Sequence, residues 1–114
     1  MNNEKKALWV VFDMKIMPTK EEMRKRFEQL YHIYLNHEAI ESKCWYVNEE
    51  KKQWGAFYVF RSDELLQEYL KSSLWTKEIP GRWGVQPSQV SVLDPGPVLC
   101  KKTITEPHDS WISD

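Results

Sequence analysis

The stretch WGAFYVF, residues 54–60, is apolar on both of its faces. Trp, Phe, Tyr and Val favour β-strands, and successive side chains of a strand point to opposite faces of its sheet. The run does not alternate apolar with polar residues, so both faces of its sheet are expected to be covered. The stretch ALWVVF, residues 7–12, has the same character and predicts a second buried strand.

Two helices are predicted from capping residues that precede apolar residues at helical spacing. Thr19 and Glu22 have the spacing of a capping box, and the helix that follows is expected to end near Asn36. Ser62 is a suitable N-cap for a second helix, which should extend to about residue 73. The apolar stripe of the first helix consists of Met23, Phe27, Leu30, Tyr31 and Tyr34.

The remaining segments predict a hairpin, a loop and a short last strand. Residues 41–60 are expected to form a hairpin around a polar loop of about four to six residues. Residues 75–89 contain two Gly and two Pro and are expected to be a loop, and VSVL, residues 90–93, to be a strand. The order strand, helix, strand, strand, helix, strand predicts an α+β ferredoxin-like sandwich, with both helices on one face of a four-stranded antiparallel sheet.

Length and charge limit the classes of partner. A chain of 114 residues is one domain by size, which we assign to residues 1–97, with residues 98–114 as an extension that is either exchanged with a partner as an extra strand or flexible. Lys and Arg total 16 against 17 Asp and Glu, so there is no basic stripe for nucleic acid. No apolar run is long enough to span a membrane. We therefore expect a soluble, cytoplasmic protein.

Cysteine and histidine spacing predicts no metal site. Cys44 and Cys100 are too far apart for a C-x-x-C motif and are expected to be reduced thiols that pack in the interior. His32 and His37 are five residues apart, which places them about 140° around a helix, so they cannot share a metal ion.

The two apolar faces of the predicted sheet imply a homodimer. The helices cover one face, and leaving the other in water would expose an apolar patch larger than monomers normally tolerate. A second copy of the same sheet is the simplest cover, related by a two-fold axis. The alternative is that residues 98–114 fold back over this face.

The middle of the chain resembles a known family. The resemblance is sharpest from residue 43 to residue 70 and covers roughly residues 7–97 in element order. The residues that carry the resemblance are Lys43-x-Trp45, Gly55, Tyr58-x-Phe60, Ser62 or Asp63, Tyr69-Leu70, and Asp94-Pro95. This pattern resembles the YdhR-like monooxygenases, which are relatives of the antibiotic-biosynthesis monooxygenases in the dimeric α+β barrel superfamily. The loop bearing Arg82 and Trp83 and the extension after Pro97 match no pattern of the family.

An even-numbered hairpin loop would bring a lysine and three aromatic residues to one face of the sheet. Residue 45 then pairs with residue 56, so Lys43, Trp45, Trp54 and Tyr58 share a face. If this face lies towards the helices, Trp45 and Tyr58 meet Phe27 and Tyr31 in an aromatic-walled pocket suited to flat ligands.

The resemblance implies a chemistry for this pocket. Well-studied members of the superfamily oxidise polyphenolic or anthrone-like substrates with molecular oxygen and use neither metal nor flavin. The resemblance therefore implies a cofactor-independent monooxygenase that acts on a small aromatic, polyphenolic or quinone-like metabolite. Lys43 or Arg82 would stabilise the substrate anion and Tyr58 would donate a hydrogen bond to it, so we take Lys43 and Tyr58 as catalytic candidates. The expected substrate-binding residues are Trp45, Trp54, Phe27, Tyr31, Arg82 and Trp83.

Other interpretations stay open at this point. The same pocket would serve a non-catalytic module that binds a small aromatic ligand, or the aromatic residues would be plain core of a structural dimer. Lys43 would then extend to solvent from an edge strand, and Arg82 would form a cation–π pair with Trp83.

Overall fold

The computed structural model describes residues 4–97 of the 114-residue chain. Its four strands form one antiparallel sheet in the order β2-β3-β1-β4. The ferredoxin-like α+β fold is thereby confirmed. The elements are β1 Lys6–Asp13, α1 Lys20–Leu35, β2 Ile40–Asn48, β3 Gln53–Phe60, α2 Asp63–Lys71, the π-helical turn η1 Leu74–Glu78, α3 Ile79–Trp83 and β4 Gln89–Leu93.

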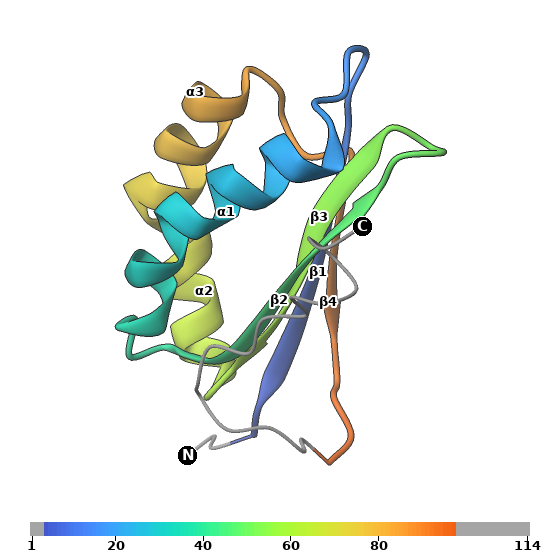
Figure 1. Cartoon of the computed structure of the whole chain (residues 1–114). Helices are drawn as coiled ribbons and strands as arrows, with labels where there is room; N and C mark the ends of the chain where they lie inside the picture. The colour runs from blue at the N-terminus through green and yellow to red at the C-terminus, as the bar shows by residue number, and fades with distance from the viewer. Residues whose placement is uncertain (1–3, 98–114) are drawn as a thin grey trace.

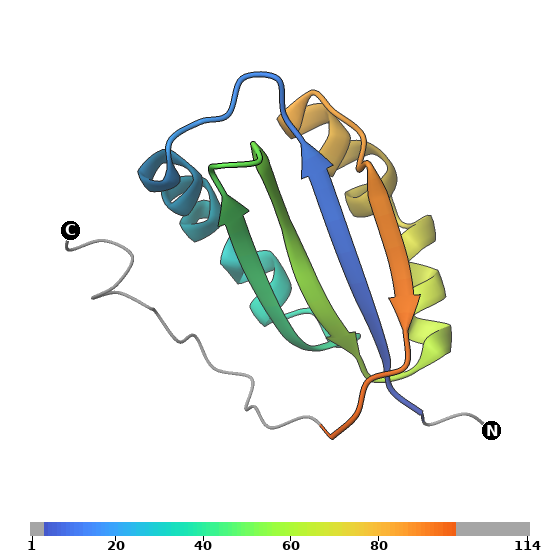
Figure 2. The same ribbon diagram turned by 90° about the vertical axis from the view of Figure 1, so that its right-hand side faces the viewer.

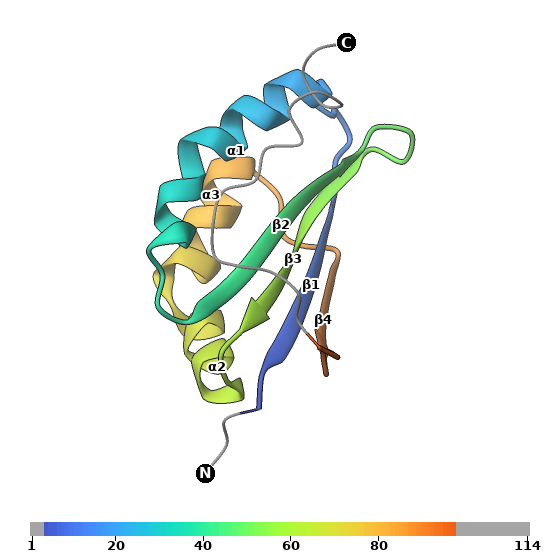
Figure 3. The ribbon, with the colours of Figure 1, turned by 60° about the horizontal axis from the view of Figure 1, so that its bottom comes forward.

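The molecule has two layers. Figure 1 shows α1, α2 and α3 together on one side of the sheet, and Figure 2 shows the opposite face of the sheet turned towards the viewer with the helices behind it. The same layering is visible from below in Figure 3. The face that packs against the helices is called the inner face, and the opposite one the outer face.

The predicted caps and the hairpin are confirmed. The Glu22 backbone N–H donates to Thr19 Oγ1 at 3.2 Å, and the Thr19 N–H donates to Glu22 Oε1 at 2.9 Å, which is the reciprocal capping box. Ser62 accepts a hydrogen bond from the Leu65 N–H at 3.2 Å at the start of α2. The loop between β2 and β3 is residues 49–52, an even number, so the strand faces are those expected.

One expectation for the second half of the chain is wrong. Residues 74–83, most of which were expected to form a loop, are helical: α2 ends at the extended residue Ser72, and the π-helical turn η1 that follows runs directly into α3. Pro80 lies in the first turn of α3, where a missing N–H costs nothing. Gly84 ends the helix with φ +73°, and its N–H donates to the Pro80 carbonyl at 2.7 Å. Pro and Gly therefore delimit a short helix here instead of excluding one.

The inner face of the sheet is the core. Its side chains on β1 and β3 are at most 3% exposed, and helix α1 contributes further apolar residues to the same core. These strand residues are Leu8, Val10, Phe12, Trp54, Ala56, Tyr58 and Phe60.

The outer face carries exposed aromatic side chains. Trp9 and Phe57 are direct neighbours across β1 and β3, and they are 38% and 41% exposed. Cys44 pairs with Phe57 from β2 and is exposed, so the expectation that it packs in the interior is wrong. Side chains alternate between the two faces along β2, so Cys44 points outward while its neighbours Lys43 and Trp45 point inward. Cys100 and the extension 98–114 lie outside the described residues.

The Tyr46 side chain lies on the outer face of the sheet, over Gly55. Its hydroxyl donates to the Val10 carbonyl at 3.1 Å and accepts from the Trp9 indole N–H at 3.2 Å. Tyr46 pairs with Gly55 on β3, and the missing side chain of Gly55 is what lets the phenol ring lie flat against the sheet.

Within residues 4–97, none of the helices has the length and apolar character needed to cross a bilayer.

Candidate active site beneath the helices

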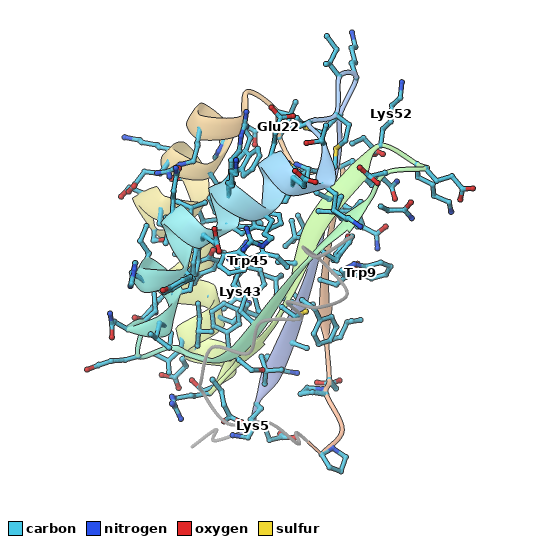
Figure 4. All side chains as sticks on the ribbon, in the orientation of Figure 1. Lys5, Trp9, Glu22, Lys43, Trp45 and Lys52 are labelled. Atoms are coloured by element: carbon cyan, nitrogen blue, oxygen red, sulfur yellow. The ribbon has the colours of Figure 1, made fainter. Side chains whose placement is uncertain are left out.

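Lys43 as a whole is only partly buried, but its amine lies among aromatic rings that border the core. Lys43 pairs with Tyr58 on the inner face, and Figure 4 shows Lys43 and Trp45 reaching from β2 into the space below α1. Lys43 Nζ lies 3.1 Å from the ring centroid of Tyr34, 4.3 Å from that of Tyr58 and 4.4 Å from that of Trp45. We call these three rings the aromatic cage. The expectation that Lys43 extends to solvent from an edge strand is wrong.

The cage does not replace the hydration of the amine. Among residues 4–97, no carboxylate forms an ion pair with Lys43 and no polar group forms a hydrogen bond with it. Burial therefore lowers the pKa of the Lys43 amine well below its usual range. Cation–π contacts with the three rings oppose this effect, because each is worth about 2 kcal/mol or more when desolvated, but none of the rings supplies the counter-charge that a buried ion needs.

Three phenols lie on the α2 side of the lysine. The Tyr58 and Tyr69 hydroxyls are 3.1 Å apart in the core, and the Tyr34 phenol interacts with both of them. Burial raises the pKa of Tyr58 and of Tyr69 far above the usual value, and the second-largest cause is the neighbouring phenol. These hydroxyls are therefore protonated donors at every physiological pH.

Indole rings form the opposite end of the site. Trp54 stacks on Phe12 with centroids 4.2 Å apart, and Trp83 from α3 lies 4.2 Å from Trp54. Trp54 is 3% exposed, and its Nε1 has no hydrogen-bond partner among the described residues. A buried donor without a partner costs free energy unless a ligand or solvent accepts from it.

These groups surround a small cavity between the sheet and the helices. Its volume is about 20 Å³, room for about one water molecule. The π-helical turn η1 and α3 contribute one wall, which carries the side chains of Glu78 and Arg82. The lining residues are Val10, Phe12, Leu30, Tyr34, Lys43, Trp45, Trp54, Ala56, Tyr58, Leu74, Glu78, Ile79, Arg82 and Trp83.

Most of the predicted site residues meet at this cavity. Phe27 lies one layer behind, with its ring 5.2 Å from that of Trp45. Tyr31 does not line the cavity; its ring lies 4.2 Å from that of His32 on α1, one turn from the inward-facing Tyr34. The predicted residues that line the cavity are Lys43, Trp45, Trp54, Tyr58, Arg82 and Trp83.

Several residues of the site were not predicted from the sequence, among them Tyr34 and Glu78. Tyr34 belongs to the apolar stripe of α1 and is 5% exposed, so its membership of the stripe was the available signal. Glu78 was missed although Arg82 and Trp83 of the same segment were chosen; it lies one turn before Arg82 only because the segment is helical. The cation over the Trp83 ring is Arg26 from α1, at 5.0 Å, and not the neighbouring Arg82. In the described part of the chain, no three His, Cys, Asp or Glu side chains are grouped as metal ligands.

Fold and cavity together define a class: a small α+β sandwich with a ferredoxin-like sheet and an aromatic-lined cavity between sheet and helices. The family model described as "Putative mono-oxygenase ydhR" matches residues 8–94. The chain belongs to this monooxygenase family. No match was found among curated proteins.

One solved structure supports the fold. The structure titled "Structural Genomics, protein YJCS" has a TM-score of 0.61 at 9% sequence identity, and the match covers 81% of this chain and 99% of that one. The structure of At3g17210 from Arabidopsis thaliana has a TM-score of 0.48 at 16% identity, covering 86% of this chain and 98% of that one. At such low identity the YjcS likeness speaks for the fold alone.

Proposed function

We propose that this protein is a monooxygenase that oxidises a small aromatic, polyphenolic or quinone-like metabolite with dioxygen and needs neither metal nor flavin. The observation that carries the proposal is the Lys43 amine, held without a counter-ion in the aromatic cage at the wall of a cavity. A base of lowered pKa in a dry, aromatic site suits the formation of a delocalised anion.

An anthrone illustrates the substrate class. Its CH2 group loses a proton readily because the resulting anion is delocalised over three rings. The neutral Lys43 amine takes that proton and becomes the ammonium that pairs with the anion, while the Tyr58 hydroxyl and the unpartnered Trp54 N–H donate to substrate oxygens. Trp45 and Trp83 provide ring faces for stacking.

The reaction balances without an added reductant. The anion transfers an electron to dioxygen, the two radicals combine into a hydroperoxide, and the proton on Lys43 returns as water leaves. Oxidation of CH2 to C=O releases four electrons, and dioxygen takes up four as one oxygen atom enters the product and the other becomes water. The protein has to supply only proton transfer, orientation and the exclusion of bulk water.

Substrate entry requires the cavity to widen. Sites for ligands of drug size measure about 300–1,000 Å³, far above the 20 Å³ found here. The segment 74–83 forms one wall and ends at Gly84, whose left-handed φ and open surroundings permit rotation. We propose that this segment moves outward to admit the substrate.

Replacing Lys43 by Met should abolish the activity while keeping the fold. Met has a similar length and fits an aromatic cage. The rate of quinone formation from air-exposed anthrones or quinols should fall roughly 100-fold or more, the usual value of a positioned base. Quinone absorbance measures it on protein treated with chelator.

Lys25→Met is the matched control, because Lys25 is an exposed lysine on α1 far from the cavity wall. Its rate should equal that of the wild type. A broad panel with no rate above background for the wild type would overturn the proposal, and so would equal rates for wild type and Lys43→Met.

We also propose that the protein is a homodimer joined through the outer sheet faces. Trp9, Phe57 and the exposed Cys44 form a continuous row across three strands. A contiguous apolar row in the middle of a sheet face is typical of an interface.

Phe57→Glu should weaken this dimer by roughly tenfold or more, as expected for a central aromatic residue. Ile33→Glu on α1 is the matched control, since both side chains are 41% exposed, and it should leave association unchanged. Sedimentation velocity over a micromolar concentration series measures both. A wild-type monomer throughout that series would refute the dimer.

A further inference from the structure

We propose that the Lys43 amine is also a covalent capture site for small carbonyl compounds, which it holds as an imine inside the cavity. This activity needs no dioxygen, and it shares only the neutral Lys43 amine with the proposed oxygenation. Its ligand class is an aldehyde or ketone on a small, apolar molecule.

The environment of Lys43 differs from that of the lysines that form ion pairs. Lys5 and Lys6 form ion pairs with Glu41 and Asp94 at the surface, where the charged form is solvated and unreactive. Lys43 Nζ instead contacts three ring faces and lines the cavity. Ring faces neither accept a hydrogen bond strongly nor block the nitrogen lone pair, so the amine is free to react.

The groups that face the amine keep it neutral. Tyr34 from α1 and Tyr58 from β3, the latter bonded to Tyr69 of α2, are protonated phenols without charge. Glu78 and Arg82 on the helical segment carry opposite charges and are exposed at the cavity wall, so their effects on Lys43 oppose one another. Burial is therefore the dominant effect on the amine and lowers its pKa. A lysine whose pKa is lowered in this way is an activated nucleophile.

The chemistry balances with water as the only other product. The nitrogen lone pair attacks the carbonyl carbon, one N–H proton moves to the oxygen, and the carbinolamine loses water to give the C=N bond. The remaining N–H proton passes to the departing hydroxyl, which leaves as water, and the Tyr58–Tyr69 pair stays protonated. The cavity is small, so it selects small carbonyl compounds.

Reductive trapping tests the proposal with formaldehyde as the probe. The intact protein is treated with limiting formaldehyde and cyanoborohydride at pH 6, and peptide mass spectrometry follows methylation of each lysine. At this pH exposed lysines are almost fully protonated. We expect Lys43 to be methylated at least about tenfold faster than exposed Lys25, because only the neutral amine attacks the carbonyl.

Two comparisons make the result decisive. In urea the preference for Lys43 should disappear, since it depends on the folded cavity, and in Lys25→Met the reaction at Lys43 should be unchanged. Methylation of Lys43 at a rate equal to or below that of Lys25 in the folded protein would overturn the proposal. Oxygen consumption is not measured in this assay, so its result is separate from that for oxygenation.

Discussion

Lys43→Met is expected to be more stable than the wild type, with a gain that is largest near neutral pH and shrinks as the pH rises towards 10. The folded wild type either holds an unpaired ammonium in the aromatic cage or gives up its proton there, and both cost free energy. Met removes this cost and fills the same space. Chemical unfolding of both proteins from pH 6 to pH 10 measures the difference.

The sign of the pH dependence follows from the lowered pKa. Between the folded pKa and the unfolded value near 10.4, the unfolded chain binds one more proton at Lys43 than the folded protein does, so wild-type stability rises with pH in this window. Below the folded pKa both states are protonated and the slope disappears. One proton corresponds to a slope of at most about 1.4 kcal/mol per pH unit.

The matched control is again Lys25→Met, which should follow the wild-type curve in parallel. A stability difference between Lys43→Met and wild type that stays constant from pH 6 to pH 10 would show that Lys43 is as protonated in the folded protein as in the unfolded chain. Such a result would remove the basis for a neutral amine at the cavity.

Gly55→Ala is expected to destabilise the protein by about 3 kcal/mol or more, as overpacking against a backbone does. A Cβ at Gly55 would overlap the Val10 carbonyl oxygen and lie 2.6 Å from the Tyr46 hydroxyl oxygen. The added methyl would therefore disrupt both the β1–β3 pairing and the hydrogen bond between Tyr46 and Val10. Denaturant unfolding measures the loss.

Gly81→Ala is the control for the same chemical change. Gly81 lies in α3 with nothing within 4 Å of an added Cβ, so the substitution should be neutral or stabilise the protein by up to about 1 kcal/mol through helix propensity. Equal effects at the two glycines would show that the close contact at Gly55 does not exist in solution.

Local patterns were sufficient to predict the sheet and the contents of its inner face. The four-residue loop fixes the parity of β2 against β3, and that parity alone places Lys43, Trp45, Trp54 and Tyr58 together. The sequence did not show whether this face of the sheet is the one that the helices cover. Tertiary packing determines it, because the ring of Phe27 on α1 stacks on the ring of Trp45. The stacked rings also explain why a lysine on an edge strand turns inward.

Features that depend on long-range contacts were not predictable from the sequence. Pro and Gly in residues 75–89 favoured a loop, but η1 and α3 pack over the sheet, and this packing outweighs the local signals. Tyr31 and Tyr34 were equally suitable from the stripe of α1, and only the angle of the helix on the sheet selects Tyr34. Cys44 follows the parity of its strand and not the usual burial of cysteine.

The most direct test of the account is the oxidation of an anthrone under isotope-labelled dioxygen by wild type and by Lys43→Met. We predict that the wild type accelerates formation of a quinone carrying one labelled oxygen atom, and that the folded variant leaves only the uncatalysed rate. Equal acceleration by both proteins, or enzyme-dependent product whose new oxygen comes from water, would contradict the assignment of the Lys43 cavity as an oxygenation site.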